Sequence, residues 1–216
     1  MNAKDIDWGS QNYASEYLLS IADISILLSE QQDLINDAVR ILFESWVQGG
    51  TVFVIGNGGS ASTATHFCAD MFKTVIESPG GKGIKALALS DNVPLVSALV
   101  NDWGWENLYK AQLETLMRKG DVVAAFSVHG GSGSDKAGKW SQNLLRALQF
   151  AKEMGGTTIG FSGFDGGAMK ELCDVCIVVP ADSTPAVESM HSVLAHLITF
   201  RLKHLINSKP EEGGAR

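Results

Sequence analysis

The sequence predicts a doubly wound, three-layer α/β domain built on a five-stranded parallel sheet, with an N-terminal helical hairpin. Five short runs rich in apolar residues alternate with longer segments of helical periodicity. Almost every residue in these runs is apolar, which is typical of strands buried on both faces of a parallel sheet. Glycine-rich segments follow several of the runs, at the strand ends where this fold class binds ligands. Because crossovers between parallel strands are right-handed, we expect helices on both faces of the sheet.

The first 50 residues predict two helices. Apolar side chains recur every three or four positions over 13–28 and again over 34–46. Gly49 and Gly50 end the second helix. These helices carry more apolar surface than a lone hairpin can hide, so we expect them to pack on the main domain or on another subunit.

The rest of the chain alternates between strands and helices. We expect strands at 51–56, 85–90, 121–128, 157–163 and 176–180. We expect helices at about 60–74, 93–101, 105–118, 135–154, 166–172 and 184–207. The chain is therefore expected to form one domain over 1–216, with a helical arm (1–50), an α/β core (51–207) and a disordered tail (208–216).

The composition argues against several classes of protein. The 216 residues include 17 Lys and Arg against 24 Asp and Glu, and the net charge of −7 comes without a basic tail. Nucleic-acid binders normally show a basic face, so no nucleic-acid partner is expected. No apolar run reaches the roughly 18 residues of a membrane span, and the polar N-terminus lacks the apolar core of a signal peptide. We expect a cytoplasmic protein with no membrane partner.

The three cysteines predict neither a disulfide framework nor a metal site. An odd number without a secretory signal argues against disulfides. Cys173 and Cys176 form a C-x-x-C, but this motif leads into a strand instead of opening a helix, and no second pair accompanies it. We expect these cysteines to act as small apolar residues.

The segment GNGGSA at 56–61 follows a strand and opens a helix. Its spacing fits the G-x-G-x-x-A fingerprint of dinucleotide-binding folds. That fingerprint requires an acidic residue about 20 residues further on, whereas the candidate Asp91 lies 35 residues after Gly56. The simpler interpretation is a helix N-terminus that binds another anion, with Asn57 and Ser60 contacting sugar hydroxyls or phosphate.

The segment SVHGGSGS at 127–134 is the stronger anion-binding candidate. Ser127, Ser132 and Ser134 lie among glycines just before a predicted helix. Hydroxyl donors combined with backbone N–H groups suit a phosphate monoester. No Lys follows in the Walker spacing, so ATP hydrolysis is not indicated. The alternative is a Ser/Gly loop that only caps the helix.

Histidines and carboxylates gather on two of the predicted helices. His66 and Asp70 are four residues apart and share a helix face. Glu188 and His191 are three apart, whereas Glu188 and His196 are eight apart, about 12 Å along a helix axis. Glu188 and His196 can share one metal only if it lies midway; otherwise they belong to different sites or pair across subunits. A lone histidine is more often a satisfied core or surface residue.

Together these residues resemble the sugar isomerase (SIS) domain, and within it the phosphoheptose isomerases. The matching segments are GNGGS at 56–60 followed by His66 and Phe67, Asn101-Asp102, the loop from Ser127 to Ser132, and ESMHSVLAH at 188–196. The two leading helices also fit. The resemblance covers residues 10–207, and the motifs occur in the family's order.

The resemblance implies a flavodoxin-like fold and a homotetramer with active sites at subunit interfaces. It implies interconversion of sedoheptulose 7-phosphate and D-glycero-D-manno-heptose 7-phosphate through an enediol or enediolate. Proton transfer is implied for Asp70 and His196, and a divalent metal, most often zinc, for His66, Asp70, Glu188 and His196. The implied substrate-binding positions are Asn57, Gly58, Gly59, Ser60, Asn101, Asp102, Ser127, Val128, His129, Ser132 and Glu188.

The chain departs from the family pattern at four places. Asp70 replaces the catalytic Glu, and a shift of about 1 Å can cost on the order of a hundredfold in rate. Glu188 replaces a Gln, which adds a carboxylate and favours a bound cation. His129 replaces a serine of the phosphate loop, and 133–141 is an insertion. His129, Lys136 and Lys139 still offer cations to an anion, so the sugar phosphate can differ from heptose 7-phosphate.

Two other functions fit the same resemblance. The chain could be a non-catalytic adaptor, as in a related SIS tetramer that binds the bacterial replication initiator, or a regulator that binds a sugar phosphate. That relative has non-ionisable residues at both catalytic positions, whereas this chain has Asp70 and His196. Ionisable side chains there favour catalysis.

Overall fold

A computed structural model describes residues 3–131 and 140–208. Its centre is an all-parallel sheet with the strand order β2-β1-β3-β4-β5. The strands are β1 (Thr51–Gly56), β2 (Lys85–Ala88), β3 (Val122–Phe126), β4 (Thr157–Ser162) and β5 (Val175–Val178). In register, Val54 of β1 lies between Ala88 of β2 and Ala124 of β3. All carboxyl ends therefore meet at one edge, as predicted for this fold class.

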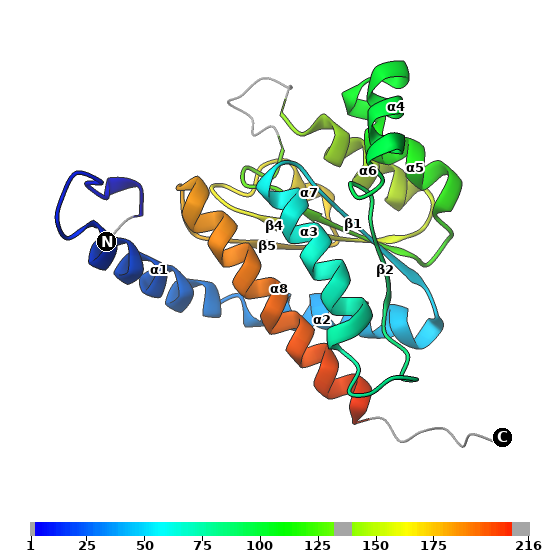
Figure 1. Ribbon diagram of the computed structural model, residues 1–216, viewed down its shortest axis with the longest axis horizontal. Coiled ribbons are helices and arrows are strands. Elements are labelled where there is room, and N and C mark those ends of the chain that lie inside the picture. The colour runs from blue at the N-terminus through cyan, green and yellow to red at the C-terminus, as the bar shows by residue number, and fades with distance from the viewer. Residues whose placement is uncertain (1–2, 132–139, 209–216) are drawn as a thin grey trace.

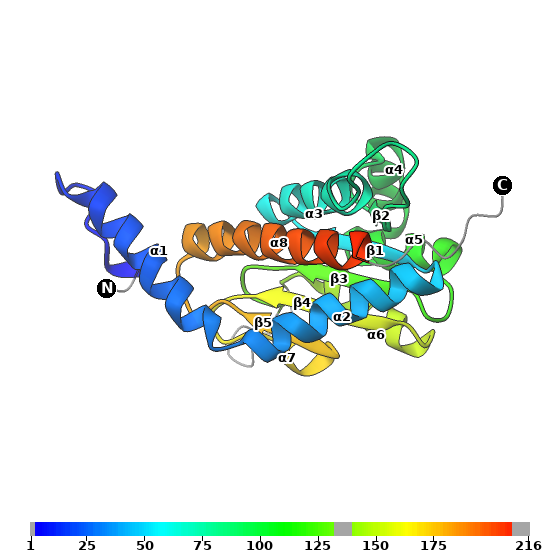
Figure 2. The same ribbon diagram turned by 90° about the horizontal axis from the view of Figure 1, so that it is seen from below.

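Helices cover both faces of the sheet (Figures 1 and 2). One face is packed by α2 (Gln32–Gln48), α3 (Gly59–Ala69) and α8 (Thr184–Asn207), and α3 continues into a π-helix, η2 (Asp70–Thr74). The other face is packed by α4 (Val93–Trp103), α5 (Leu108–Leu116), α6 (Gln142–Glu153) and α7 (Met169–Leu172). The short 3-10 helices are η1 (Ala3–Asp5) and η3 (Trp105–Asn107). The three-layer prediction is confirmed.

The element boundaries differ from the predictions where glycines or turns intervene. The expected helix at 105–118 begins as the 3-10 turn η3, and the helix expected from 166 begins at Met169. Gly166 and Gly167 have φ values of 92° and 54°, so that segment cannot be regular helix. The helix expected from 135 begins at Gln142 and is preceded by Ser141 with φ 57°. Positions 132–139 and residues 209–216 of the tail predicted at 208–216 lie outside the described residues.

The two N-terminal helices are present, but they form a bent arm instead of a closed hairpin. Helix α1 (Tyr13–Ser29) projects away from the sheet, while α2 lies against it (Figures 1 and 2). In the link between them, Glu30 keeps helical backbone angles and Gln31 leaves the helical region with ψ 24°, and the chain bends there without reversing. Ile24 and Leu28 near the bend are buried, whereas Leu18 further out is 66% exposed.

Candidate active site

Three side chains from two adjacent helices meet at the surface of the α3–α8 layer. His66 on α3 and Asp70 at the start of η2 lie one turn apart, and His196 reaches them from α8. The Nε2 atoms of His66 and His196 lie 3.7 and 3.9 Å from the same Asp70 oxygen, Oδ2. Asp70 is only 14% exposed, whereas both imidazoles are about half exposed. The structure thus brings three of the predicted site residues together.

A π-helical turn orients the Asp70 carboxylate. Helix α3 changes to the π form at Asp70, and this form is rare and frequent at functional sites. Within the turn, Thr74 Oγ1 donates a hydrogen bond to Asp70 Oδ1 at 2.8 Å. Because Thr74 engages Oδ1, the other oxygen, Oδ2, faces the two histidines.

This group suits a divalent metal ion. Each of the three side chains offers one ligand atom, and these atoms lie within 4.8 Å of one another. Two ligand atoms that each lie about 2.1 Å from one ion are at most about 4.2 Å apart. The distances of 3.7 and 3.9 Å from the two histidine Nε2 atoms to Asp70 Oδ2 are within this limit. Two imidazoles and a carboxylate are suitable donors for zinc, and also for iron, nickel or manganese. Three protein ligands leave a position open for substrate.

Glu188, the fourth implied ligand, lies apart from this group. Its carboxylate packs on Gly59, so closely that a Cβ there would lie 2.8 Å from Glu188 Cδ. Gly59 and Glu188 belong to the first turns of α3 and α8, whereas His196 lies two turns further along α8. The structure thus places Glu188 at the N-terminus of α3, where the helix dipole favours a negative charge.

The GNGGS loop joins β1 to α3 at the carboxyl edge of the sheet. Gly58 adopts φ 56°, and the Ser60 N–H donates to the Asn57 carbonyl at 3.1 Å. Ser60 is buried. The Asn57 amide exchanges two hydrogen bonds with the amide of Asn143 on α6. The loop therefore lies where the sequence predicted, with the Asn57 side chain already held by another residue.

Asn101 and Asp102 are placed differently from the other implied substrate residues. Both are exposed in the last turns of α4, and Asn101 Nδ2 donates to Asp102 Oδ1 at 2.7 Å. Helix α4 packs on α5 and η3, on the far side of the sheet from α8 (Figure 1). Within the described part of one chain, these residues are therefore not brought to the histidine cluster.

The loop after β3 is closely packed. Ser127 is buried and its N–H donates to Phe161, while Val128 accepts from the Gly163 N–H at 3.0 Å. The His129 ring lies 4.2 Å from the Phe164 ring and 5.6 Å from the Trp140 ring, measured between centroids. The family's serine is thus replaced by an imidazole between two aromatic rings. Ser132, Ser134, Lys136, Lys139 and most of the insertion expected at 133–141 lie outside the described residues.

His191 is a core residue. It is fully buried, its Nε2 lies 3.2 Å from the Ser162 carbonyl, and its ring packs edge-on to Phe126. Burial lowers the pKa of His191 to about 4, against the opposing effect of the Ser162 carbonyl. The imidazole is therefore neutral near pH 7, with Nε2–H as the donor. Nδ1 has no hydrogen-bond partner among the described residues.

The cysteines are buried free thiols, as expected. Burial raises the pKa of Cys173 and of Cys176. Both sulfurs pack on Gly160 of β4, where a Cβ would lie 3.0 Å from each. These side chains therefore fill space in the core beneath β4 and β5.

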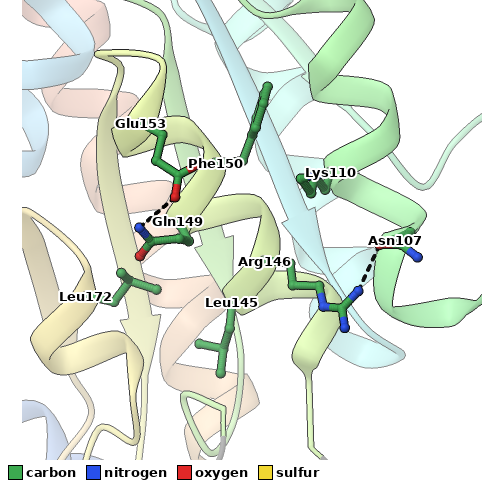
Figure 3. A pocket seen from close by; sticks show the side chains of 8 residues that line it. All are labelled: Asn107, Lys110, Leu145, Arg146, Gln149, Phe150, Glu153 and Leu172. Carbon is green, nitrogen blue, oxygen red and sulfur yellow. Dashed lines mark hydrogen bonds between the residues drawn. The ribbon is translucent and has the colours of Figure 1, made fainter.

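Figure 3 shows a separate pocket of about 460 Å³ between α5, α6 and α7. Its two cations are both engaged: Lys110 pairs with Glu114 at 2.8 Å, and Arg146 donates to Asn107 at 2.9 Å. The pocket lies on the opposite face of the sheet from α3 and α8 (Figure 1). It is therefore distinct from the site predicted by the sequence.

Three residues that shape the site were missed in the sequence analysis. Thr74 holds Asp70, Asn143 pairs with Asn57, and the buried Tyr109 hydroxyl donates to the Gly56 carbonyl. Burial raises the pKa of Tyr109 to about 12. Only Thr74 carries a local signal, because residues four apart on a helix face each other.

Comparisons with known proteins agree with the fold. The family model described as "SIS domain" matches residues 16–163. A phosphoheptose isomerase of Helicobacter pylori is 34% identical over 85% of this chain and 90% of its own. The lincomycin biosynthesis protein LmbN of Streptomyces lincolnensis is 41% identical over 77% of this chain, and the matched region spans 60% of that longer protein.

Solved structures show the same architecture. The structure of a phosphoheptose isomerase from Francisella tularensis superposes with a TM-score of 0.80, covering 89% of this chain and 97% of that one, at 22% identity. In the described parts of the chain, no helix is long and apolar enough to cross a membrane. The match to the family model and the 34% identity over most of both chains show that the chain belongs to the SIS domain family, together with the phosphoheptose isomerases.

Proposed function

We propose that this chain is an aldose–ketose isomerase of sugar phosphates, most directly of sedoheptulose 7-phosphate and D-glycero-D-manno-heptose 7-phosphate. The observation that carries the proposal is the partly buried Asp70 carboxylate between the imidazoles of His66 and His196. A carboxylate beside an imidazole can move protons at neutral pH. Relatives named phosphoheptose isomerases support the choice of substrate.

The reaction needs a proton to leave one carbon beside a carbonyl and return to the neighbouring carbon. Asp70 Oδ2 takes the proton from C1 of the ketose and returns it to C2 of the enediolate. In the metal-free site, where the lone pair of His196 Nε2 is available, this nitrogen carries the accompanying proton between the two substrate oxygens. Thr74 keeps Asp70 Oδ1 engaged, so that Oδ2 is the oxygen presented to the substrate.

His66, Asp70 and His196 would hold the divalent metal that the family implies, and zinc is the ion we propose. The donor set of two nitrogens and one oxygen supports this choice. The chemistry available from such an ion is polarisation of the substrate carbonyl. In this proposal Glu188 lies beside Gly59, in the part of the site that binds the sugar hydroxyls.

The loops at the sheet edge bind the rest of the substrate. We assign the sugar hydroxyls to Asn57, Gly58, Gly59 and Ser60, and the phosphate to the loop that contains Ser127, Val128 and His129. Gly130 of that loop packs on the backbone of Gly166, where no side chain fits. The loop is therefore held close to its neighbour, which suits a preformed anion site.

We propose a cytoplasmic homotetramer with active sites between subunits. The exposed face of α8 carries Val193, Leu197 and Phe200 on either side of His196, at 47, 47 and 59% exposure. An apolar stripe of this kind usually marks an interface. A neighbouring subunit would cover it, and would offer the Asn101 and Asp102 of its own α4 to the site.

The test is NMR of the purified protein with sedoheptulose 7-phosphate in D2O, with and without added Zn²⁺. We expect an aldose that carries deuterium at C2. The variants Asp70→Asn and His196→Asn should abolish this exchange while the assembly stays intact. A folded, zinc-loaded protein that exchanges no deuterium into this or any other sugar phosphate would favour the adaptor or regulator instead.

A further inference from the structure

The side chains of Asn57 and Asn143 form a reciprocal amide pair. Asn57 Nδ2 donates to Asn143 Oδ1 at 3.0 Å, and Asn143 Nδ2 donates to Asn57 Oδ1 at 2.8 Å. Asn143 is fully buried, whereas Asn57 is partly exposed. The Leu144 N–H also donates to Asn143 Oδ1 at 3.0 Å. This backbone donor identifies the Asn143 oxygen, and the cyclic pair then fixes the orientation of the Asn57 amide.

The pair connects segments that cover opposite faces of the sheet. Asn57 lies between β1 and α3, the helix that carries His66 and leads to Asp70. Asn143 lies in the first turn of α6, which packs on the other face with α5. The two hydrogen bonds therefore cross the carboxyl edge of the sheet, from the predicted ligand-binding loop after β1 to the first turn of α6.

The pair leaves part of the Asn57 amide for a ligand. Each amide in the cycle uses one N–H and one lone pair, so Asn57 keeps one N–H and one lone pair. A sugar hydroxyl can donate to that lone pair and accept from that N–H. The buried Asn143 side chain is anchored by the Leu144 N–H. It therefore fixes the plane of the Asn57 side-chain amide before substrate binds. A fixed donor loses less conformational entropy on binding than a free one.

We infer that Asn143 is a positioning residue, which holds the Asn57 amide in the orientation that binds the sugar hydroxyls of the substrate. This inference rests on the proposed isomerase function. It assigns no contact with substrate to Asn143, which acts only through Asn57. The expected consequence of losing the pair is a higher KM with a smaller change in kcat.

The variant Asn143→Asp tests this assignment. A carboxylate has no N–H group. Whichever way the Asn57 amide turns, its side-chain oxygen therefore faces an oxygen of the new Asp, and two acceptors repel each other. Protonation of the new carboxylate restores the missing donor. Neither native side chain titrates, nor does the Leu144 N–H, so the wild-type pair is insensitive to pH. We expect the KM for sedoheptulose 7-phosphate to rise about tenfold or more at pH 8 and to approach the wild-type value at pH 5.

A matched control is Asn92→Asp. Among the described residues, the Asn92 side chain forms one hydrogen bond, which it accepts from the Leu95 N–H at the start of α4, and an Asp can take over that role. This control makes the same chemical change and should keep the wild-type KM at both pH values. If Asn143→Asp does not fold at pH 8, Asn143→Leu, which is similar in size and uncharged, takes its place. It should raise KM by a similar factor at every pH.

The inference is overturned if a folded Asn143→Asp protein at pH 8, or a folded Asn143→Leu protein at any pH, has the wild-type KM. It is also overturned if the KM of Asn143→Asp is raised equally at pH 5 and pH 8, because that result indicates only general disruption. Failure of the isomerase proposal looks different, since the wild-type protein itself would then be inactive. In that case the ¹⁵N side-chain signal of Asn57 still tests the pair, and must move in Asn143→Leu.

Discussion

The imidazole rings of His66 and His196 lie edge to face, with centroids 5.0 Å apart and planes inclined at 78°. They belong to different helices, α3 and α8, which lie side by side on one face of the sheet. This arrangement turns both Nε2 atoms toward the Asp70 carboxylate. The contact between α3 and α8 therefore determines whether the site can hold an ion.

Replacing Asp70 with Asn should remove metal binding. The amide lacks the negative charge that favours a cation between two imidazoles, so we expect Zn²⁺ to bind at least about 100-fold more weakly. Isothermal titration calorimetry measures this directly. Glu44→Gln, which removes a surface carboxylate paired with Arg40 on α2, should leave Zn²⁺ binding unchanged. Equal affinity in the Asp70→Asn protein would show that Asp70 is not a ligand.

Replacing Thr74 with Val should weaken metal binding without unfolding the protein. The variant keeps the shape of the side chain but removes the hydrogen bond to Asp70 Oδ1. We expect a loss of about tenfold in Zn²⁺ affinity and of about 1 kcal/mol in stability. Thr65→Val removes a similar bond, from Thr65 on α3 to Asp91 in the turn after β2, and should leave the Zn²⁺ affinity intact. Equal Zn²⁺ affinities of the two variants, measured by titration calorimetry, would contradict the prediction.

Replacing Gly59 with Ala should lower activity while the fold is kept. The new Cβ would overlap the Glu188 carboxylate, which is the flexible end of its side chain and can move away. Alanine also favours the helix by up to about 1 kcal/mol. We expect isomerase activity to fall about tenfold or more with an unchanged or higher melting temperature. Activity within a factor of two of wild type would mean that the position of Glu188 is not needed.

Acid should destabilise the protein through His191. The pKa of His191 in the folded protein is about 4, against about 6.5 in an unfolded chain. The unfolded state therefore binds this proton first as pH falls. The free energy of unfolding should drop by up to about 3 kcal/mol between pH 6.5 and pH 4.

Urea unfolding of the metal-free protein at several pH values measures this loss. His191→Gln keeps a donor for the Ser162 carbonyl but cannot titrate, so it should lose less stability over the same range. His204→Gln, at an exposed position on the same helix, should follow the wild type. Identical pH dependence in all three proteins would rule out His191 as the source.

A charge in the apolar stripe of α8 should break the assembly. Val193, Leu197 and Phe200 lie on one helical face and are exposed in the single chain. We expect Phe200→Glu to lower the mass measured by light scattering from that of a tetramer. Arg201→Glu, at the neighbouring exposed position, should leave the mass unchanged. A wild-type protein that is already monomeric would contradict the proposed assembly.

Sequence periodicity predicted the strands and most helices because burial on both faces leaves long apolar runs, as in Val122–Phe126. It could not predict the start of α6 at Gln142 or the open bend at Glu30, which depend on backbone angles that several residue types can adopt. In the site, the spacing of His66 and Asp70 on one helix was sufficient to place them together.

Contacts between segments that are far apart in the chain could not be predicted from the sequence. The pairing of Asn57 with Asn143 has no periodic signature, because it depends on how the loop after β1 meets the first turn of α6 at the sheet edge. The position of Glu188 was left open by its spacing to His196. It was decided by the packing of Glu188 on Gly59, which belongs to another helix.

The π-helical turn that begins at Asp70 makes the length of this segment critical. In η2 the Val75 N–H bonds to the Asp70 carbonyl five residues back, instead of the usual four. Deleting one residue between Met71 and Lys73 would allow an ordinary α-helix, but would move Thr74 off the turn that supports the Asp70 carboxylate. Natural variants of this chain should therefore tolerate substitutions in 71–73 far better than insertions or deletions there.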